Sequence, residues 1–95
     1  MKKLKITESS GNVFVDLGFS PEEATILAMR SQLMGELRIK IRDQHWTQAE
    51  AAKVLSISQS RVSDLIRGKW EKFSLDMLII LATRAGKKVA LKLAA

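Results

Sequence analysis

Cysteine is absent from this sequence of 95 residues, and proline and histidine occur once each. Without cysteine, the chain can form neither a disulfide framework nor a thiolate zinc site. A glycine-rich phosphate loop and a recognisable pair of carboxylates are also missing, and the only histidine, His45, has no second ligand beside it. We therefore expect no catalytic site, no metal and no cofactor, which argues against an enzyme.

Long hydrophobic runs are absent as well. The basic start of the chain, with Lys2, Lys3 and Lys5, is not followed by an apolar stretch of the length that a signal peptide needs. No stretch of the chain is apolar over the length of a membrane-spanning helix. We expect a cytoplasmic protein without a membrane partner.

Aromatic residues make up only 5% of the chain, whereas 46% of its residues are hydrophobic, which favours a helical core of aliphatic side chains. This length allows one small domain. The formal net charge is +6; the first 35 residues carry four basic and four acidic side chains, so the other 12 basic and six acidic ones account for the whole excess. Contact with nucleic-acid phosphates requires such a basic surface, although charge alone does not identify it.

Residues 47–68 contain two short helical patterns separated by a tight turn. Thr47 and Glu50 have the spacing of a capping box, in which each side chain bonds a free backbone N–H at a helix start. Ser58 is suited to cap a second helix from Gln59 to about Arg67, and Gly68 is suited to end it. The expected inward-facing residues are Ala51, Ala52, Leu55, Ile57, Val62, Leu65 and Ile66. This spacing is typical of a helix-turn-helix, and the other interpretation is an ordinary helical hairpin.

This motif resembles the XRE family, which includes lambda repressor and Cro. The matching residues are Thr47-Gln48, Ala52, Ile57-Ser58, Val62-Ser63 and Gly68. One departure is Ser56, at a turn position that the family usually fills with glycine; a positive φ there would cost serine about 1 kcal/mol. The resemblance implies a mainly α fold, a lambda-repressor-like DNA-binding domain of four to five helices.

The polar face of the motif supplies the candidate DNA contacts. The second helix would lie in the major groove, where Gln59 can pair with adenine and Arg61 with guanine. Ser60 and Asp64 are weaker candidates for base contacts. Phosphate contacts are expected from Gln48, Ser63, Arg67, Lys69 and Lys72.

The motif lies in a predicted helical domain of residues 20–86. Ser20, Pro21 and Glu23 predict a helix that continues to about Arg42, and Ser74 predicts a last helix from Leu75 to about Ala85. The first helix carries a stripe of small residues that another helix could approach, within the domain or in a dimer: Ala24, Ala28, Ser31 and Gly35.

The predicted N-terminal arm, residues 1–19, begins with a loose tail up to about residue 12. Its apolar part, residues 13–19, should pack as an extended segment against the body, the alternative being contact with a partner.

Residues 87–95 form the third predicted part of the chain. Val89, Leu91 and Leu93 alternate with Lys88 and Lys92, which predicts a short C-terminal β-strand. A lone strand leaves its backbone groups unpaired. It could pair with residues 13–17 or with its own copy in a homodimer, in which case Val89, Leu91 and Leu93 would be dimer contacts; the third option is a frayed tail.

Further landmarks resemble the HigA-type antitoxin subgroup over residues 12–94. They are Asp16-Leu17-Gly18, Phe73-Ser74-Leu75-Asp76 and the basic segment 87–93. The resemblance implies a dimer that binds double-stranded DNA at a palindromic operator, represses its own operon and neutralises a RelE-like toxin. The alternative is a protein-interaction module that mainly neutralises the toxin through residues 13–19 and the first helix, with DNA binding secondary.

Overall fold

The computed structural model describes residues 12–94. Within this range the fold is mainly helical: α1 (Val13–Asp16), α2 (Pro21–Asp43), α3 (Gln48–Leu55), α4 (Gln59–Ile66), the 3-10 turn η1 (Trp70–Lys72) and α5 (Leu75–Arg84). The predicted loose tail lies, up to residue 11, outside the described residues. None of the helices in the described range is long and apolar enough to cross a lipid bilayer.

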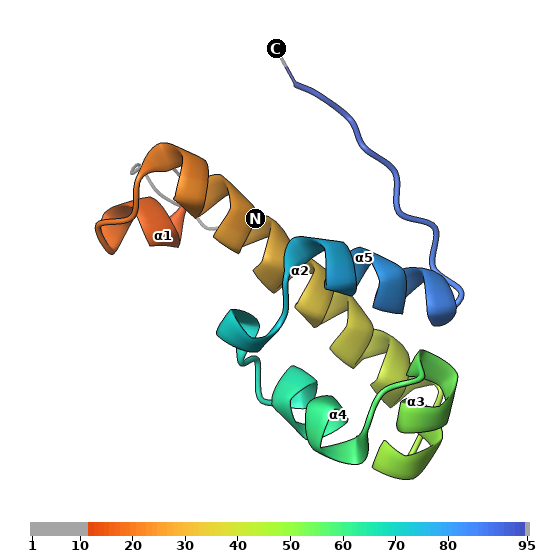
Figure 1. Ribbon diagram of the computed structural model, residues 1–95. Helices are drawn as coiled ribbons and strands as arrows, with labels where there is room; N and C mark the ends of the chain where they lie inside the picture. The colour runs from red at the N-terminus through yellow and green to blue at the C-terminus, as the bar shows by residue number, and fades with distance from the viewer. Residues whose placement is uncertain (1–11, 95) are drawn as a thin grey trace.

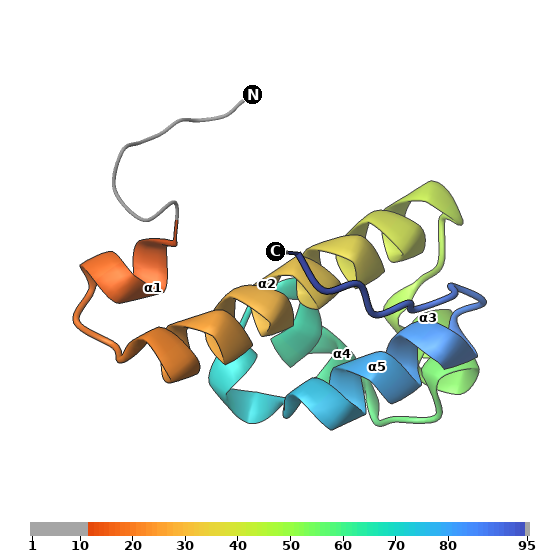
Figure 2. The ribbon, with the colours of Figure 1, turned by 90° about the horizontal axis from the view of Figure 1, so that it is seen from above.

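The long helix α2 is the spine of the molecule (Figures 1 and 2). Its start is fixed by a capping box, in which the hydroxyl of Ser20 accepts from the N–H of Glu23 and the carboxylate of Glu23 accepts from the N–H of Ser20. Pro21 occupies the first helical position, where its missing N–H costs nothing. The helix runs past α1 at one end to α3 at the other, with α4 and α5 packed along it (Figure 1).

The main core lies where α2, α3, α4 and α5 meet. Its largest fully buried side chains are Phe73, Met34, Leu37, Leu55, Leu65, Leu78, Leu81 and Val62. Burying aliphatic groups of this size stabilises the fold by about 1.5–3 kcal/mol each. The helices α3 and α4 are therefore built on the main core of the domain.

A second, smaller core joins the N-terminal residues to α2. Phe14 is buried against Ala24 and Leu27, and its ring meets that of Trp70 edge to face at 5.7 Å. Packing of this segment against the body is what the structure shows, but as helix α1 and not as an extended segment. The side chain of Asn12 accepts from the N–H of Phe14 and caps this single turn. The stripe of small residues begins here within the domain, because Ala24 is fully buried beneath α1.

The predicted C-terminal strand is not formed in the described residues. The N–H of Lys87 donates to the carbonyl of Ala82 at 2.9 Å, and no other backbone pair joins residues 88–94 to the described part of the chain. A strand needs a neighbour to complete its ladder. One predicted neighbour, residues 13–17, is helical and lies at the other end of α2, so the tail has no strand beside it among the described residues (Figure 1).

Candidate nucleic-acid interface

Helix α3 and the turn after it are held by local bonds. The N–H of Thr47 donates to Oε1 of Glu50 at 2.8 Å and Oγ1 of Thr47 accepts from the N–H of Glu50 at 3.1 Å, so the predicted capping box is present. Ser56 ends the helix with φ 58°, the left-handed conformation in which serine is strained. Ile57 then packs against the main core, which fixes the angle between α3 and α4.

Helix α4 is fixed at both ends and along one face. The hydroxyl of Ser58 accepts from the N–H of Arg61 at 3.2 Å, and Gly68 ends the helix with φ 73°. Val62 and Leu65 are fully buried, which presses one face of the helix into the core. The opposite face is left for contact with another molecule.

The predicted base-contacting residues divide into three groups. Gln59 and Ser60 are exposed at the start of α4, next to the free N–H groups of the capped helix end. Arg61 is half-buried, and its guanidinium lies over the ring of Phe73, 4.5 Å from the centroid. Asp64 has a side chain only 22% exposed, 3.9 Å from the ammonium of Lys69. Gln59 and Ser60 are therefore the most accessible of the four.

The contact with the ring of Phe73 orients the guanidinium of Arg61 and leaves the N–H donors of the guanidinium free to form hydrogen bonds. Stacking on an aromatic face engages the flat side of the group, and none of its N–H groups has a hydrogen-bond partner among the described residues. Arg61 is thus a positioned cation at the side of α4, whereas Gln59 and Ser60 form the tip.

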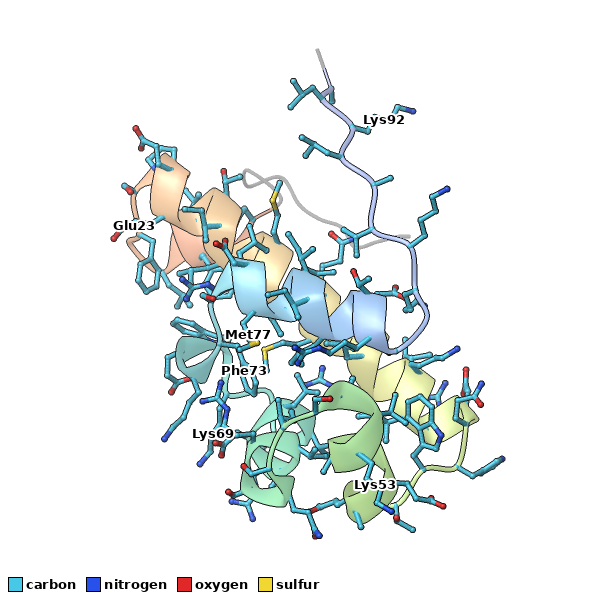
Figure 3. All side chains as sticks on the ribbon, turned by 45° about the vertical axis from the view of Figure 1, so that its right-hand side comes forward. Glu23, Lys53, Lys69, Phe73, Met77 and Lys92 are labelled. Atoms are coloured by element: carbon cyan, nitrogen blue, oxygen red, sulfur yellow. The ribbon has the colours of Figure 1, made fainter. Side chains whose placement is uncertain are left out.

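The predicted phosphate contacts surround this tip on several elements. Gln48 at the start of α3, Arg67 at the end of α4 and Lys72 in η1 are exposed. Ser63 and Lys69 are half-buried, and Asp64 partly neutralises Lys69. Figure 3 shows Lys53 and Lys69 on the side of α3 and α4, and Lys92 on the tail at the other side of the molecule.

The structure adds Arg38 of α2 to the cations near α4. A Cβ placed on Gly68 would lie only 2.8 Å from Nη1 of Arg38, so this guanidinium rests on the end of the recognition helix. Arg38 is exposed and has no ion pair or hydrogen bond among the described residues. Arg38 lies within the helix that the sequence predicts up to about Arg42. No nearby residue in the sequence indicates its contact with Gly68, which is 30 positions away.

The sequence did not indicate a role for Arg84 either. In the structure, Arg84 helps to position α3 of the helix-turn-helix motif. Its Nη1 donates to the carbonyl of Leu55 at 2.9 Å, which ties the end of α3 to the end of α5. The last carbonyls of a helix have no partner within the helix, and a cation there also complements the helix dipole. Only the tertiary fold brings these residues together.

The described residues contain no group of three or more side chains that could hold a metal ion. The face built by α3 and α4 instead offers amide, hydroxyl and guanidinium groups, which suit the base edges and phosphates of DNA.

Comparison with known protein families agrees with this geometry. Residues 13–94 match the helix-turn-helix domain family, and the chain belongs to this family of DNA-binding domains. A search of curated proteins finds no match.

Proposed function

We propose that the protein is a sequence-specific repressor of the XRE type that binds a palindromic operator as a homodimer and has no enzymatic activity. The observation that carries the proposal is the exposed pair Gln59 and Ser60 at the capped start of α4, on a helix that is held in the core by the fully buried Val62 and Leu65. An amide and a hydroxyl at this place can reach base edges when the helix enters the major groove.

The N-terminal ends of α3 and α4 support the phosphate contacts in this proposal. Free N–H groups and the helix dipole attract an anion at the start of α3, beside Gln48. Arg67 and Lys72 add charge that is free of ion pairs among the described residues. Two such domains in a dimer read half-sites about 34 Å apart, which makes an inverted repeat the expected operator.

Binding-site selection from a random pool of duplex DNA tests the proposal. We expect an enriched inverted repeat, and we expect Gln59→Ala to lower discrimination at one base pair per half-site by about 1–3 kcal/mol. Arg67→Ala is the matched comparison, because loss of a phosphate contact weakens all sequences alike. A wild-type protein that enriches no sequence would refute the proposal.

We further propose that the repressor is the antitoxin of a toxin–antitoxin operon and neutralises a RelE-like toxin. The landmarks Asp16-Leu17-Gly18 and Phe73-Ser74-Leu75-Asp76 support this subgroup by resemblance. An apolar surface at the N-terminal end adds to it, since Leu17 is 70% exposed and Val13 is 61% exposed.

The second candidate function, a module that mainly binds the toxin, is favoured by a hollow beside this surface. The hollow has a volume of about 270 Å³ and lies between Phe19, Ile26 and Trp70, with Arg30 at its wall. The buried Nε of Arg30 has no hydrogen-bond partner among the described residues.

Two variants separate the toxin role from the DNA role. We expect Leu17→Asp to abolish co-purification with the toxin from the neighbouring gene while DNA binding persists. Gln59→Ala should lower discrimination for the operator while co-purification with the toxin persists. If no toxin co-purifies with the wild-type protein, the antitoxin assignment is wrong, whereas the repressor assignment depends only on the DNA experiment.

A further inference from the structure

Asp64 is the only acidic side chain of the recognition helix α4. It lies one turn after Ser60 on the same side of the helix, because residues four positions apart are neighbours on a helix surface. Its side chain is only 22% exposed, and its carboxylate accepts no hydrogen bond from the described residues. An ionised carboxylate has acceptor positions and no donor, so this group is available to a donor on a bound molecule.

The way in which α4 ends brings Lys69 beside this carboxylate. The N–H of Gly68, which has φ 73°, donates to the carbonyl of Leu65 at 3.1 Å. The N–H of Lys69 donates to the carbonyl of Asp64 at 3.0 Å. These two bonds form a Schellman turn, in which the chain folds back on the last turn of the helix. Nζ of Lys69 consequently lies 3.9 Å from Oδ1 of Asp64.

We propose that the carboxylate of Asp64 selects a cytosine in each half-site of the operator, and that Lys69 holds and neutralises this carboxylate instead of contacting a phosphate. The inference rests on the proposed function and names one base of its DNA target. It makes Lys69, which the sequence predicts as a phosphate contact, a positioning residue.

The chemistry of a carboxylate determines which base it can read. Cytosine presents an amino donor in the major groove, whereas guanine presents the acceptors N7 and O6 and thymine presents the acceptor O4. An acceptor opposite a carboxylate is repelled. Adenine presents a donor next to an acceptor, so it suits an amide better than a carboxylate. We therefore expect cytosine opposite Asp64.

A carboxylate at a DNA surface needs a counterion. The phosphates repel its charge, and the loss of water on binding raises the free energy of the complex further. Lys69 is the only cation that forms an ion pair with Asp64 among the described residues. Figure 3 shows Lys69 beside α4. Its ammonium neutralises the carboxylate there and is less available to a phosphate than the exposed Arg67 and Lys72, which have no ion pair in the described part of the chain.

Asp64→Asn tests which base the carboxylate reads. Asparagine has nearly the same shape, but its amide pairs with adenine. In binding-site selection, we expect the wild-type half-site to contain cytosine at one position, and we expect Asp64→Asn to enrich adenine there and to lower the preference for cytosine about tenfold. If Asp64→Asn selects the wild-type sequence, the inference is wrong while the repressor function stands. A wild-type protein that enriches no sequence refutes the repressor function itself.

Lys69→Gln tests the role of the ammonium. Without its counterion the carboxylate is repelled by the phosphates and is no longer held, so we expect the ratio of operator affinity to affinity for unrelated DNA to fall about tenfold. Lys69→Arg keeps the charge and should restore the ratio. When Asp64 is already asparagine, Lys69→Gln should leave base preference unchanged. If Lys69→Gln weakens both kinds of DNA alike, Lys69 contacts a phosphate and the proposed pair is overturned.

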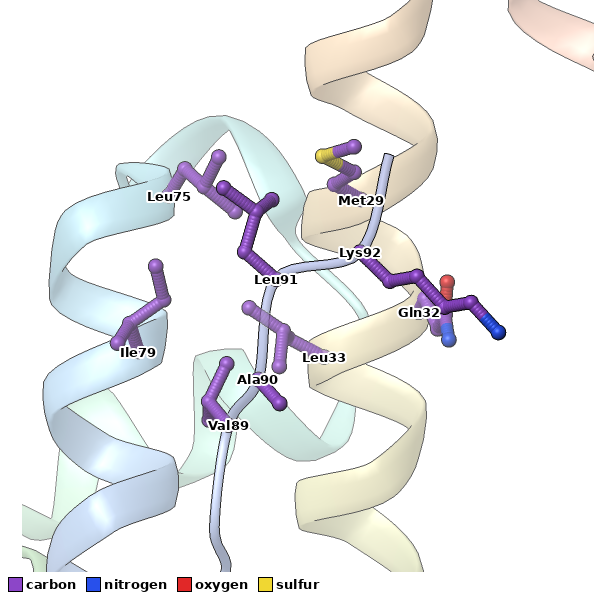
Figure 4. Close-up of a pocket in the computed structure, with 9 residues that line it drawn as sticks. All are labelled: Met29, Gln32, Leu33, Leu75, Ile79, Val89, Ala90, Leu91 and Lys92. Carbon is purple, nitrogen blue, oxygen red and sulfur yellow. The ribbon is translucent and has the colours of Figure 1, made fainter. Parts of the chain in front are cut away.

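Two other lysines are the controls, and helical circular dichroism checks that every variant is folded. Lys72→Gln removes an exposed cation without an ion pair among the described residues, so it should weaken operator and unrelated DNA alike. Lys92→Gln removes a cation from the C-terminal tail, at the groove between α2 and α5 (Figure 4), and should change neither affinity. A fall in the affinity ratio for Lys72→Gln or Lys92→Gln as large as that for Lys69→Gln would overturn the specific role of Lys69.

Discussion

At the scale of single residues, the candidate interface depends on a few side chains held by contacts outside the motif. Phe73 lies in the core and also supports the guanidinium of Arg61. Gly68 ends α4 and leaves room for Arg38, whose Nη1 would otherwise meet a Cβ. The identity of these two supporting residues therefore affects how the charges at the DNA-facing surface are arranged.

Arg38 provides a prediction at this scale. Its unpaired guanidinium rests on the end of α4, where it can reach a phosphate next to the one that we propose Arg67 contacts. We expect Arg38→Gln to weaken binding to all DNA sequences alike and to lower the slope of log K against log salt by about 1.8, because each of the two copies in the dimer loses one phosphate contact worth about 0.9. Titrations at several salt concentrations measure this slope.

Two comparisons make the Arg38 prediction specific. Lys92→Gln removes the same charge from the tail, away from α4 (Figure 3), and should leave the slope unchanged. Arg38→Lys keeps the charge and should restore the slope. An Arg38→Gln protein with the wild-type slope would show that this arginine does not touch DNA.

At the scale of elements, four helices follow from their capping residues. Ser20, Thr47, Ser58 and Ser74 each accept a hydrogen bond from the N–H three residues later, and these are the starts that the sequence predicts. Such side chains satisfy N–H groups that a helix cannot pair by itself. The start of each of these four helices could therefore be predicted from its own local sequence.

Ser58 provides the prediction at this scale, with Ser74 as its matched control. Both are N-caps, so we expect Ser58→Ala and Ser74→Ala each to lower the free energy of unfolding by about 1 kcal/mol. Only Ser58 orders the tip that carries Gln59 and Ser60, and it also lies 3.3 Å from the hydroxyl of Ser60. Operator affinity should therefore fall for Ser58→Ala and stay unchanged for Ser74→Ala; equal affinities would contradict the role of the cap.

The elements that the sequence did not predict are those without a local signal of their own. The helix α1 is a single turn, and its apolar run resembles a strand; its conformation depends on burial of Phe14 against α2 and Trp70. The prediction of a C-terminal strand was wrong for a different reason. Alternation of apolar and polar residues shows which side chains share a face of an extended segment, but it does not show that a second strand lies beside that segment. Likewise, Arg38, Arg84 and the stacking of Arg61 depend on residues far away in the chain.

At the scale of the whole molecule, α2 connects two cores of different size. The main core holds α3, α4 and α5, and the smaller one holds α1 through Phe14, Ala24 and Leu27. Trp70 borders both, because it packs on the main core and meets the rings of Phe14 and Phe19 edge to face. We infer that the described part of the chain unfolds as one cooperative unit.

Phe14→Ala tests this coupling. Loss of a buried phenylalanine costs about 3–5 kcal/mol, so we expect a large shift of the single denaturation curve followed by circular dichroism. Leu17→Ala, at a residue 70% exposed, should shift it little. A separate early transition for Phe14→Ala, with the main core still folded, would show instead that α1 melts independently.

The uneven distribution of charge between the N-terminal and C-terminal parts of residues 12–94 gives this part of the chain an electric dipole moment. Residues 12–35 carry three carboxylates and one arginine, whereas residues 36–94 carry 12 cations and six carboxylates. The field of a polyanion exerts a torque on such a molecule before contact is made. We expect this torque to turn the end with α3 and α4 toward the DNA, so that a larger share of encounters begins in the orientation that allows binding.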